Sequence, residues 1–162
     1  MPKSRLNDLI LKLERGHTKT QTRLATLTTE QWALPVYLEP AWNVRNLIVH
    51  FLSAETQLLA LAKNVVGGGT GAPPGFDIDH FNVEEQIRYQ DQSAPELLVA
   101  LGHIRQQTIQ WVHSLDDTQL DKVGRHPALG EISVEEMVTA IFGHQLLHLR
   151  DLNRIERNTT CE

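Results

Sequence analysis

Cysteine is nearly absent from this sequence: Cys161, in a polar stretch near the end, is the only cysteine among 162 residues. A framework of disulfide bonds is therefore excluded, and a reducing compartment fits the composition. The sequence also lacks the run of about 20 apolar residues that a transmembrane helix needs. Residues 1–5 do not open the long apolar segment of a signal peptide. We therefore expect a cytoplasmic protein with no membrane partner.

Basic clusters are missing as well. The formal net charge is −5 at pH 7 and no run of lysine or arginine occurs, so nucleic acid is not expected as a partner. Apolar residues make up 41% of the chain and charged residues 22%, as in ordinary soluble domains. The length is sufficient for one domain with a hydrophobic core. We expect that domain over residues 1–157 and a polar tail over residues 158–162.

Four long segments repeat apolar residues at intervals of three and four, the period of an amphipathic helix. They cover about residues 4–27, 43–65, 94–115 and 133–155. Asn43, Ser93 and Ser133 stand where N-caps belong, and the two serines open Ser-x-x-Glu capping boxes. No segment alternates convincingly with period two, so no strands are expected. The sequence predicts an all-α four-helix bundle.

The connection between the second and third helices is long, from about residue 66 to residue 93. Its glycine-rich part, residues 67–75, follows a helix and lacks the Gly-Lys-Ser/Thr ending of a phosphate-binding loop. Asn82 then has the position of an N-cap for a short helix that ends near Gln92. We expect a crossover connection between helices two and three, which carries the third helix over the end of the bundle.

Two pairs of stretches echo each other in the same order. Residues 115–120 resemble residues 27–32, and residues 133–138 resemble residues 43–48. Residues 43–48 and residues 133–138 each open a helix that carries histidine on its inner side. We infer that the chain consists of two related helical hairpins.

Histidine is frequent, with eight residues, and His144 and His148 lie one above the other on one helix face. Apolar residues continue that face, so it should point into a core: Val134, Met137, Ile141, Leu152 and Ile155. Two imidazoles in an apolar interior are costly unless something binds them, and a divalent metal is the usual partner. His50, at the edge of the apolar stripe over residues 43–65, supplies a third ligand. Three protein ligands with one open position are typical of catalytic zinc sites.

Two better-known metal motifs do not fit. The segment from His144 to His148 has Gln145 where a zinc protease of the His-Glu-x-x-His type has its glutamate base. A ferritin-like di-iron site needs two Glu-x-x-His motifs and two further glutamates. Residues 14–17 supply the one such motif that we find. Protease and di-iron chemistry are therefore not expected.

Residues 42–50 read Trp-Asn-Val-Arg-Asn-Leu-Ile-Val-His, and the His144/His148 pair is followed by Arg150. This combination resembles the DinB/YfiT-like superfamily of metalloenzymes, whose first motif is W-[ST]-x-[KR]-[DE]-x-x-x-H, and the resemblance covers nearly the whole chain. Residues 76–82 resemble the branch related to mycothiol-dependent maleylpyruvate isomerases. Asparagines replace the Ser/Thr and the acidic residue of the family motif, and both can still cap a helix.

The resemblance implies a four-helix bundle with an unusual crossover, frequent homodimers, and a divalent metal on His50, His144 and His148. It also implies thiol-dependent S-transfer or isomerisation, in which the metal lowers the pKa of a thiol cofactor such as mycothiol or bacillithiol. Our first hypothesis is a transferase, isomerase or hydrolase that uses zinc, with nickel or iron as alternatives, on a small electrophilic substrate. The second hypothesis is a non-catalytic bundle, a stress sensor or interaction module whose histidines only hold the helices.

Simpler roles are assigned to the other polar candidates. His17 is interpreted as a hydrogen-bonded core histidine, and Arg88 as an exposed helix residue. Asp79 and Asn82 either cap the short helix or reach toward the metal. The remaining candidates are expected in loops, on the surface or in the solvated last turns of the fourth helix: His80, His103, His113, His126, Arg150 and Asp151.

Overall fold

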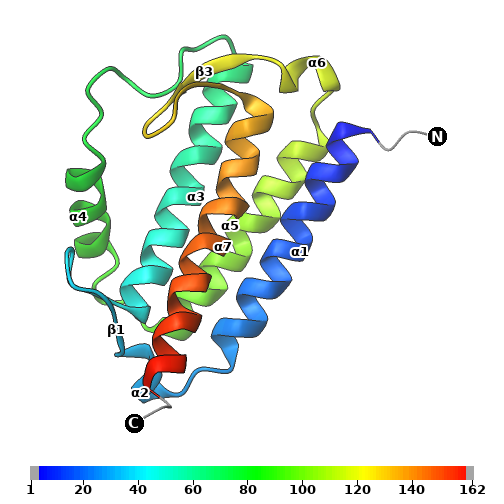
Figure 1. Cartoon of the computed structure of the whole chain (residues 1–162). Coiled ribbons are helices and arrows are strands. Elements are labelled where there is room, and N and C mark those ends of the chain that lie inside the picture. Colours follow the sequence, from blue (N-terminus) through cyan, green and yellow to red (C-terminus); the bar gives the residue numbers. More distant parts are fainter. Residues whose placement is uncertain (1–3, 160–162) are drawn as a thin grey trace.

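The structure is a computed structural model that describes residues 4–159, and it confirms the predicted four-helix bundle with a long crossover (Figure 1). The long helices are α1 (Arg5–Ala25), α3 (Val44–Val66), α5 (Ala94–His113) and α7 (Val134–Thr159). None of the helices in this part of the chain is long and apolar enough to cross a membrane. Helix α7 extends beyond its predicted end near residue 155. Residues 158 and 159 of the predicted tail belong to α7, and Cys161 lies with residues 160–162 outside the described residues.

Helices α1 and α7 run in one direction through the bundle, and α3 and α5 run in the opposite direction (Figure 1). Each of α1 and α3 packs against both α5 and α7. Helices α1 and α3 therefore take opposite corners of the bundle, although they follow each other in the sequence. The crossover returns the chain along the outside of α3, so that α5 starts at the end where α3 started (Figure 1).

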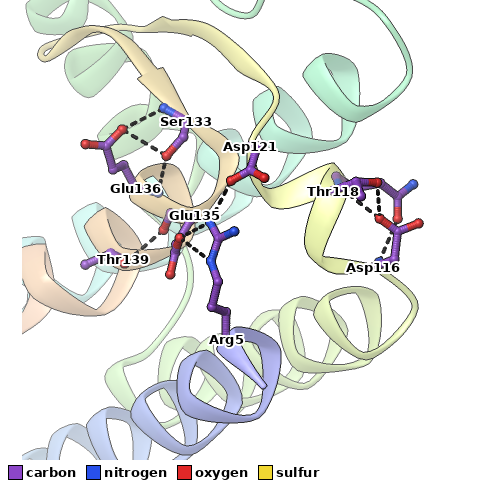
Figure 2. A network of polar contacts seen from close by, with 9 residues as sticks. Arg5, Asp116, Thr118, Asp121, Ser133, Glu135, Glu136 and Thr139 are labelled. Atoms are coloured by element: carbon purple, nitrogen blue, oxygen red, sulfur yellow. Dashed lines mark hydrogen bonds and ion pairs between the residues drawn. The ribbon is translucent and has the colours of Figure 1, made fainter. Parts of the chain in front are cut away.

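N-caps begin the long helices where the sequence predicts them. Asn43 and Ser93 each form a capping box with the residue three positions later. At the start of α7, Ser133 N donates to Glu136 Oε2 at 2.7 Å and Glu136 N donates to Ser133 Oγ at 3.2 Å (Figure 2). These side chains satisfy backbone N–H groups that the first turn of a helix leaves without partners. Local sequence therefore determines where these helices begin.

Arg5 joins the starts of the neighbouring parallel helices α1 and α7. Its guanidinium lies 2.8 Å from Asp121 and forms an ion pair and hydrogen bonds with Glu135, in the first turn of α7 (Figure 2). All three side chains are partly exposed, so we regard the contact as a guide to alignment and not as a major source of stability.

Two short antiparallel hairpins precede α3 and α7. Strands β1 (Pro35–Tyr37) and β2 (Trp42–Asn43) form the first hairpin, and β3 (Val123–His126) and β4 (Gly130–Ser133) form the second. The expectation that the chain has no strands was wrong. Strands of two to four residues are too short for period two to be recognised. Pairing between the strands, and not the local pattern, defines them.

The chain repeats one arrangement twice, as the echoed stretches predict. In the first copy, α1 is followed by the short helix α2 (Thr29–Trp32), the β1–β2 hairpin and α3. In the second copy, α5 is followed by α6 (Asp117–Leu120), the β3–β4 hairpin and α7. Both short helices begin with a capping box. One hairpin lies at each end of the bundle (Figure 1).

Helix α4 (Ile78–Arg88) lies in the crossover, beside α3 (Figure 1). It begins after Asp77, whose side chain accepts a backbone N–H of the first turn. The predicted N-cap, Asn82, lies inside the helix, so that prediction was wrong: Asp77 offers the same capping chemistry five positions earlier. Near the end of α4, the guanidinium of Arg45 donates to the carbonyl oxygen of Tyr89 at 2.5 Å. This contact fixes α4 against the first turn of α3.

The loop before α4 pairs with β3. The N–H of Ala72 donates to the carbonyl oxygen of Arg125 at 2.8 Å, and the N–H of Arg125 donates back to the loop at 2.8 Å. Gly71 has a φ of +84°, and a Cβ there would lie 2.5 Å from the Arg125 carbonyl oxygen, so glycine is required. A Cβ on Gly124 would lie 2.2 Å from a methyl carbon of Val65. These close approaches hold the β3–β4 hairpin over the end of α3.

The core consists of two apolar clusters, one toward each end of the bundle. The cluster near the start of α1 includes Leu9, Leu13, Leu61, Val112 and Met137. The cluster at the other end includes Leu24, Leu47, Phe51, Leu101 and Leu152. Between these two clusters, α3, α5 and α7 contribute buried polar side chains.

This polar layer consists of Glu55, Arg105, Thr108 and Gln145, each at most 2% exposed. The guanidinium of Arg105 donates to both carboxylate oxygens of Glu55, at 2.7 and 3.0 Å, and to the carbonyl oxygen of Leu13 at 2.8 Å. Thr108 and Gln145 donate to the same carboxylate at 2.8 and 3.0 Å. One network thus connects all four long helices and pairs the two buried charges, as burial requires.

Candidate metal centre

Three histidine side chains converge between α3 and α7. Nε2 of His144 lies 2.8 Å from Nε2 of His50 and 3.1 Å from Nε2 of His148. One ring nitrogen from each residue lies within 4.8 Å of the other two. The structure therefore brings together all three histidines that the sequence analysis selected, which we call the histidine trio.

The histidines of α7 border the core and do not point to its centre. His144 and His148 are only partly buried, whereas Gln145 is 2% exposed and belongs to the polar layer. The prediction that the pair points into the core was wrong, because α7 is rotated about its axis by part of a turn from the predicted orientation. Facing the edge of the core leaves the two rings accessible from one side.

The contacts among the three nitrogens suit a cation better than hydrogen bonds. Nε2 of a neutral imidazole carries either one proton or one lone pair, so Nε2 of His144 cannot form ordinary hydrogen bonds with both neighbours. Three lone pairs directed at one cation remove this conflict. Nitrogen ligands at ~2.0–2.1 Å around a tetrahedral Zn²⁺ lie about 3.3 Å apart, close to the spacings of 2.8 and 3.1 Å. The donor set therefore fits a divalent cation that accepts imidazole ligands.

All three rings favour the neutral form. Burial lowers the pKa of His50 to about 4 and the pKa of His144 to about 3, and the neighbouring histidines act in the same direction. Burial also lowers the pKa of His148, although the Asp151 carboxylate opposes this shift. Neutral imidazole is the form that binds a metal, so metal binding at pH 7 does not require these rings to lose a proton first.

A tyrosine and an aspartate fix the orientation of His148. The hydroxyl of Tyr37, in β1, donates to Asp151 Oδ2 at 2.7 Å and lies 2.6 Å from Nδ1 of His148. Because the hydroxyl donates its hydrogen bond to the carboxylate, the Tyr37 oxygen accepts a hydrogen bond from Nδ1–H of His148. This tautomer leaves a lone pair on Nε2, toward the other two histidines. The arrangement matches the hydrogen bonds that orient metal-bound histidines in other proteins.

The surroundings of His50 are different. The ring of Trp42 packs on the ring of His50, with centroids 4.9 Å apart. Asn82 of α4 is close enough to favour the protonated form of His50, but Nδ1 of His50 has no hydrogen-bond partner within residues 4–159. If Nε2 binds a metal, Nδ1 carries a proton, and the side-chain oxygen of Asn82 is a candidate acceptor for it.

A cleft of about 590 Å³ opens beside the trio, and His50 and His144 form part of its lining. Side chains of α3, the loop before α4, α4, α7 and the β3–β4 hairpin surround the cleft. The apolar ones include Leu58, Phe76, Phe81, Ile132 and Leu147. Pockets of roughly 300–1,000 Å³ are typical for small-molecule ligands. A small molecule in this cleft would therefore lie against two of the three histidines.

Several polar residues differ from their predicted roles. Asp151 was expected in a solvated turn but accepts from Tyr37. His126 was expected in a loop or on the surface but ends strand β3, is only 9% exposed and lines the cleft. Nδ1 of His17 is buried without a hydrogen-bond partner in the described part of the chain, so the hydrogen-bonded core role is not observed. Each of these environments depends on segments distant in the sequence, and no local signal could have revealed them.

Asp79 has neither of its two predicted roles, because it lies in the exposed first turn of α4, where Asp77 is the N-cap, and does not join the trio. The residues expected to be exposed are exposed, namely His80, Arg88, His103, His113 and Arg150. Within the described residues, the trio is therefore distinct from the remaining histidines in mutual distance.

A family model described as the DinB superfamily matches residues 12–152, a region that contains the whole trio and the cleft. The chain belongs to the DinB superfamily. This confirms the resemblance on which the sequence analysis relied. This DinB protein is a four-helix bundle whose histidine trio lies between α3 and α7.

Relatives of this DinB protein carry different names. A protein of Oceanobacillus iheyensis named “Putative metal-dependent hydrolase OB0413” is 23% identical over 113 residues, which cover 70% of this chain and 64% of that protein. The match thus spans less than two thirds of that relative's length. YfiT from Bacillus subtilis, described as having an unusual four-helix bundle topology, has a TM-score of 0.79 at 16% identity, covering 99% of this chain and 90% of its own.

The mycothiol-dependent maleylpyruvate isomerase is also similar in structure. Its TM-score is 0.75 at 14% identity, over 91% of this chain and 60% of its own. At these identities the two structural matches establish the shared fold.

Proposed function

We propose that this DinB protein is a metal-dependent enzyme in which His50, His144 and His148 bind one divalent cation, and that it acts on a small electrophilic substrate. Zinc is the first choice of metal, with nickel or iron as alternatives. The convergence of three neutral Nε2 atoms beside a cleft is the observation that carries the proposal. A divalent ion at the trio would lower the pKa of a water molecule or a low-molecular-weight thiol in its open position and so supply a strong nucleophile at neutral pH.

Some residues orient the metal-binding histidines, and others line the cleft. Tyr37 and Asp151 fix the tautomer of His148, and Trp42 packs on the ring of His50. The apolar walls of the cleft exclude water from the open side of the trio, which strengthens electrostatic interactions there. A substrate in the cleft would meet the nucleophile at His50 and His144, the two members of the trio that line it.

The reaction class follows from which nucleophile is used. With a thiol, the protein would be an S-transferase or an isomerase, and with water it would be a hydrolase. We propose the thiol reaction first. One comparison of rates distinguishes thiol transfer from hydrolysis. Zinc-loaded protein is assayed with 1-chloro-2,4-dinitrobenzene with and without a low-molecular-weight thiol, and with a p-nitrophenyl ester without thiol. Acceleration of the first reaction supports thiol transfer, and acceleration of the ester reaction alone supports hydrolysis.

Metal content tests the proposal before any activity is known. Elemental mass spectrometry of untagged protein should find about one divalent metal per chain. His50→Ala and His148→Ala should lose it, because two remaining ligands bind weakly. His103→Ala, which removes an exposed histidine of α5, should keep it. The proposal is wrong if the parent protein holds no metal even after soaking with zinc and nickel.

A purely structural role for the trio is the alternative. It predicts that a chelator unfolds the protein, because binding and folding are then coupled. We expect the helical circular dichroism signal to survive chelation, since two apolar clusters and the polar layer already join the four long helices. Loss of most helicity on chelation would favour the non-catalytic alternative.

A further inference from the structure

His126 ends strand β3 and has an unusual set of hydrogen bonds. Its Nδ1 accepts from the backbone N–H groups of Ala128 at 3.0 Å and Leu129 at 3.1 Å. Both bonds require a lone pair on Nδ1, so the ring proton must lie on Nε2. The turn between β3 and β4 therefore fixes both the tautomer and the orientation of this ring.

The proton on Nε2 is left without an acceptor. His126 is 9% exposed, and Nε2 has no hydrogen-bond partner among the residues that the structure describes. A buried donor without a partner is rare in native proteins and calls for an explanation. Burial also lowers the pKa of His126, so the ring stays a neutral donor at pH 7.

His126 lies at the cleft that adjoins the histidine trio. It lines this cleft together with His144, and a positive charge on His126 would lower the pKa of His144. Nε2 itself has almost no accessible surface beside the cleft, so a ligand that accepts from it must displace the side chains that cover this atom, while its reactive group lies against His144.

The other residues of the cleft restrict the charge of such a molecule. No lysine or arginine is found among the residues that line the cleft, and Glu136 is the one carboxylate there. Oε2 of Glu136 already accepts from Ser133 in the capping box. An anionic ligand would lose its hydration without gaining a cationic partner from these side chains, which is costly.

We propose that the cleft binds an uncharged, mainly apolar molecule, and that Nε2–H of His126 donates a hydrogen bond to an acceptor on it, such as a carbonyl oxygen. The inference rests on the proposed function in that it names the substrate class of the same site. It predicts that phosphate or carboxylate groups are poorly accepted wherever they do not reach a metal at the trio. His126 is thus a specificity-determining residue, contributed by the hairpin and not by the helices that carry the trio.

A matched pair of ligands tests the charge preference. Benzylacetone and 3-phenylpropanoate have the same shape, but the methyl group of the ketone is replaced by a charged oxygen in the carboxylate. Binding is followed by the shifts of backbone amide signals in NMR, with metal-free protein so that the carboxylate cannot coordinate a metal. We expect the ketone to bind at least tenfold more tightly and to shift the signals of Ala128 and Leu129. Equal or tighter binding of the carboxylate would overturn the proposal.

His126→Asn tests the donor. The asparagine oxygen can replace Nδ1 as acceptor for the two turn N–H groups, but the Nε2–H donor is lost. We expect the variant to fold, and to bind benzylacetone about two- to tenfold more weakly, the range that one neutral hydrogen bond contributes. Binding of n-propylbenzene, which has no acceptor, should not change. Equal weakening for both ligands would show loss of packing only and would contradict the donor role.

The tautomer can be measured without any ligand. The ¹⁵N chemical shifts of the His126 ring in the parent protein should show a protonated Nε2 and a bare Nδ1. The opposite tautomer would overturn the proposal even if the His126→Asn variant failed to fold. Failure of metal binding with intact ketone binding would instead reject the proposed function and leave the ligand class of the cleft in place.

Discussion

The hydroxyl oxygen of Tyr37 lies 2.6 Å from Nδ1 of His148, although 111 positions separate the two residues in the sequence. Tyr37 comes from the β1–β2 hairpin, and His148 comes from the second half of α7. The hydroxyl donates to Asp151, one turn further along α7. A residue before α3 thus controls the tautomer of a histidine on α7, and the first hairpin becomes part of the candidate metal centre.

Tyr37→Phe should weaken metal binding by about 10- to 100-fold, the usual effect of removing a hydrogen bond to a ligand. The ring still packs, but Nδ1 of His148 loses its acceptor. A competition titration with a chromophoric chelator measures the affinity. Tyr89→Phe, the same change at the other tyrosine of the chain, serves as the control and should leave the affinity unchanged. An unaltered affinity in Tyr37→Phe would show that this hydrogen bond does not support a ligand.

Glu55→Leu should lower the free energy of unfolding by about 3–5 kcal/mol, because it leaves the Arg105 guanidinium buried without its counter-charge. The double variant Glu55→Leu/Arg105→Met removes both charges and should be more stable than Glu55→Leu. Urea unfolding at a fixed metal concentration measures both. A double variant as unstable as the sum of Glu55→Leu and Arg105→Met, each measured alone, would show no coupling between the two side chains and would contradict charge compensation.

Gly124→Ala should destabilise the protein by about 1–3 kcal/mol, the usual cost of forcing extra volume into a packed site. The new Cβ would lie 2.2 Å from a methyl carbon of Val65. In the double variant with Val65→Ala, that methyl group is gone, and the two changes should cost less together than the sum of their separate effects. Thermal unfolding of the four proteins completes the cycle. Simple additivity would show that the cost of the new Cβ does not come from its contact with Val65.

The stability of the protein should fall in mild acid, in part because of His17. Burial, and then the positive charge of Arg105, lower the pKa of His17 in the folded chain, while Glu55 opposes them. Above pH ~6.5, the ordinary histidine pKa, neither the folded nor the unfolded chain is protonated at His17, and this residue has no effect. Below that pH the unfolded chain takes up the proton first, so stability falls as pH decreases toward the folded pKa.

His17→Gln removes this contribution, and the comparison with the parent protein isolates it from the other histidines. A difference of one bound proton between the unfolded and folded chains changes the free energy of unfolding by about 1.4 kcal/mol per pH unit. Below pH ~6.5 we expect the slopes of parent and variant to differ by part of this value. Urea unfolding between pH 7.5 and 5 measures it. Parallel curves for parent and variant over this range would show that burial of His17 does not perturb its protonation.

Local sequence was a good guide to the helices and a poor guide to what lies between them. Asn43, Ser93 and Ser133 cap their helices as predicted, because a cap satisfies N–H groups only three positions away. The hairpins were missed because two to four paired residues leave no period to detect. The start of α4 was placed at Asn82 and lies after Asp77, because Asp and Asn are both good N-caps and the prediction did not consider Asp77.

The sequence by itself determined the helical period, and with it the pairing of His144 and His148 on one face of α7. It could not determine how far α7 is rotated about its axis. That rotation places Gln145 in the polar layer and turns the two histidines toward the edge of the core, where His50 and Tyr37 meet them. The rotation of one helix depends on the packing of all four long helices, and the burial of His126 depends on the hairpin that the crossover holds in place. The tertiary structure therefore decided which side chains surround the trio.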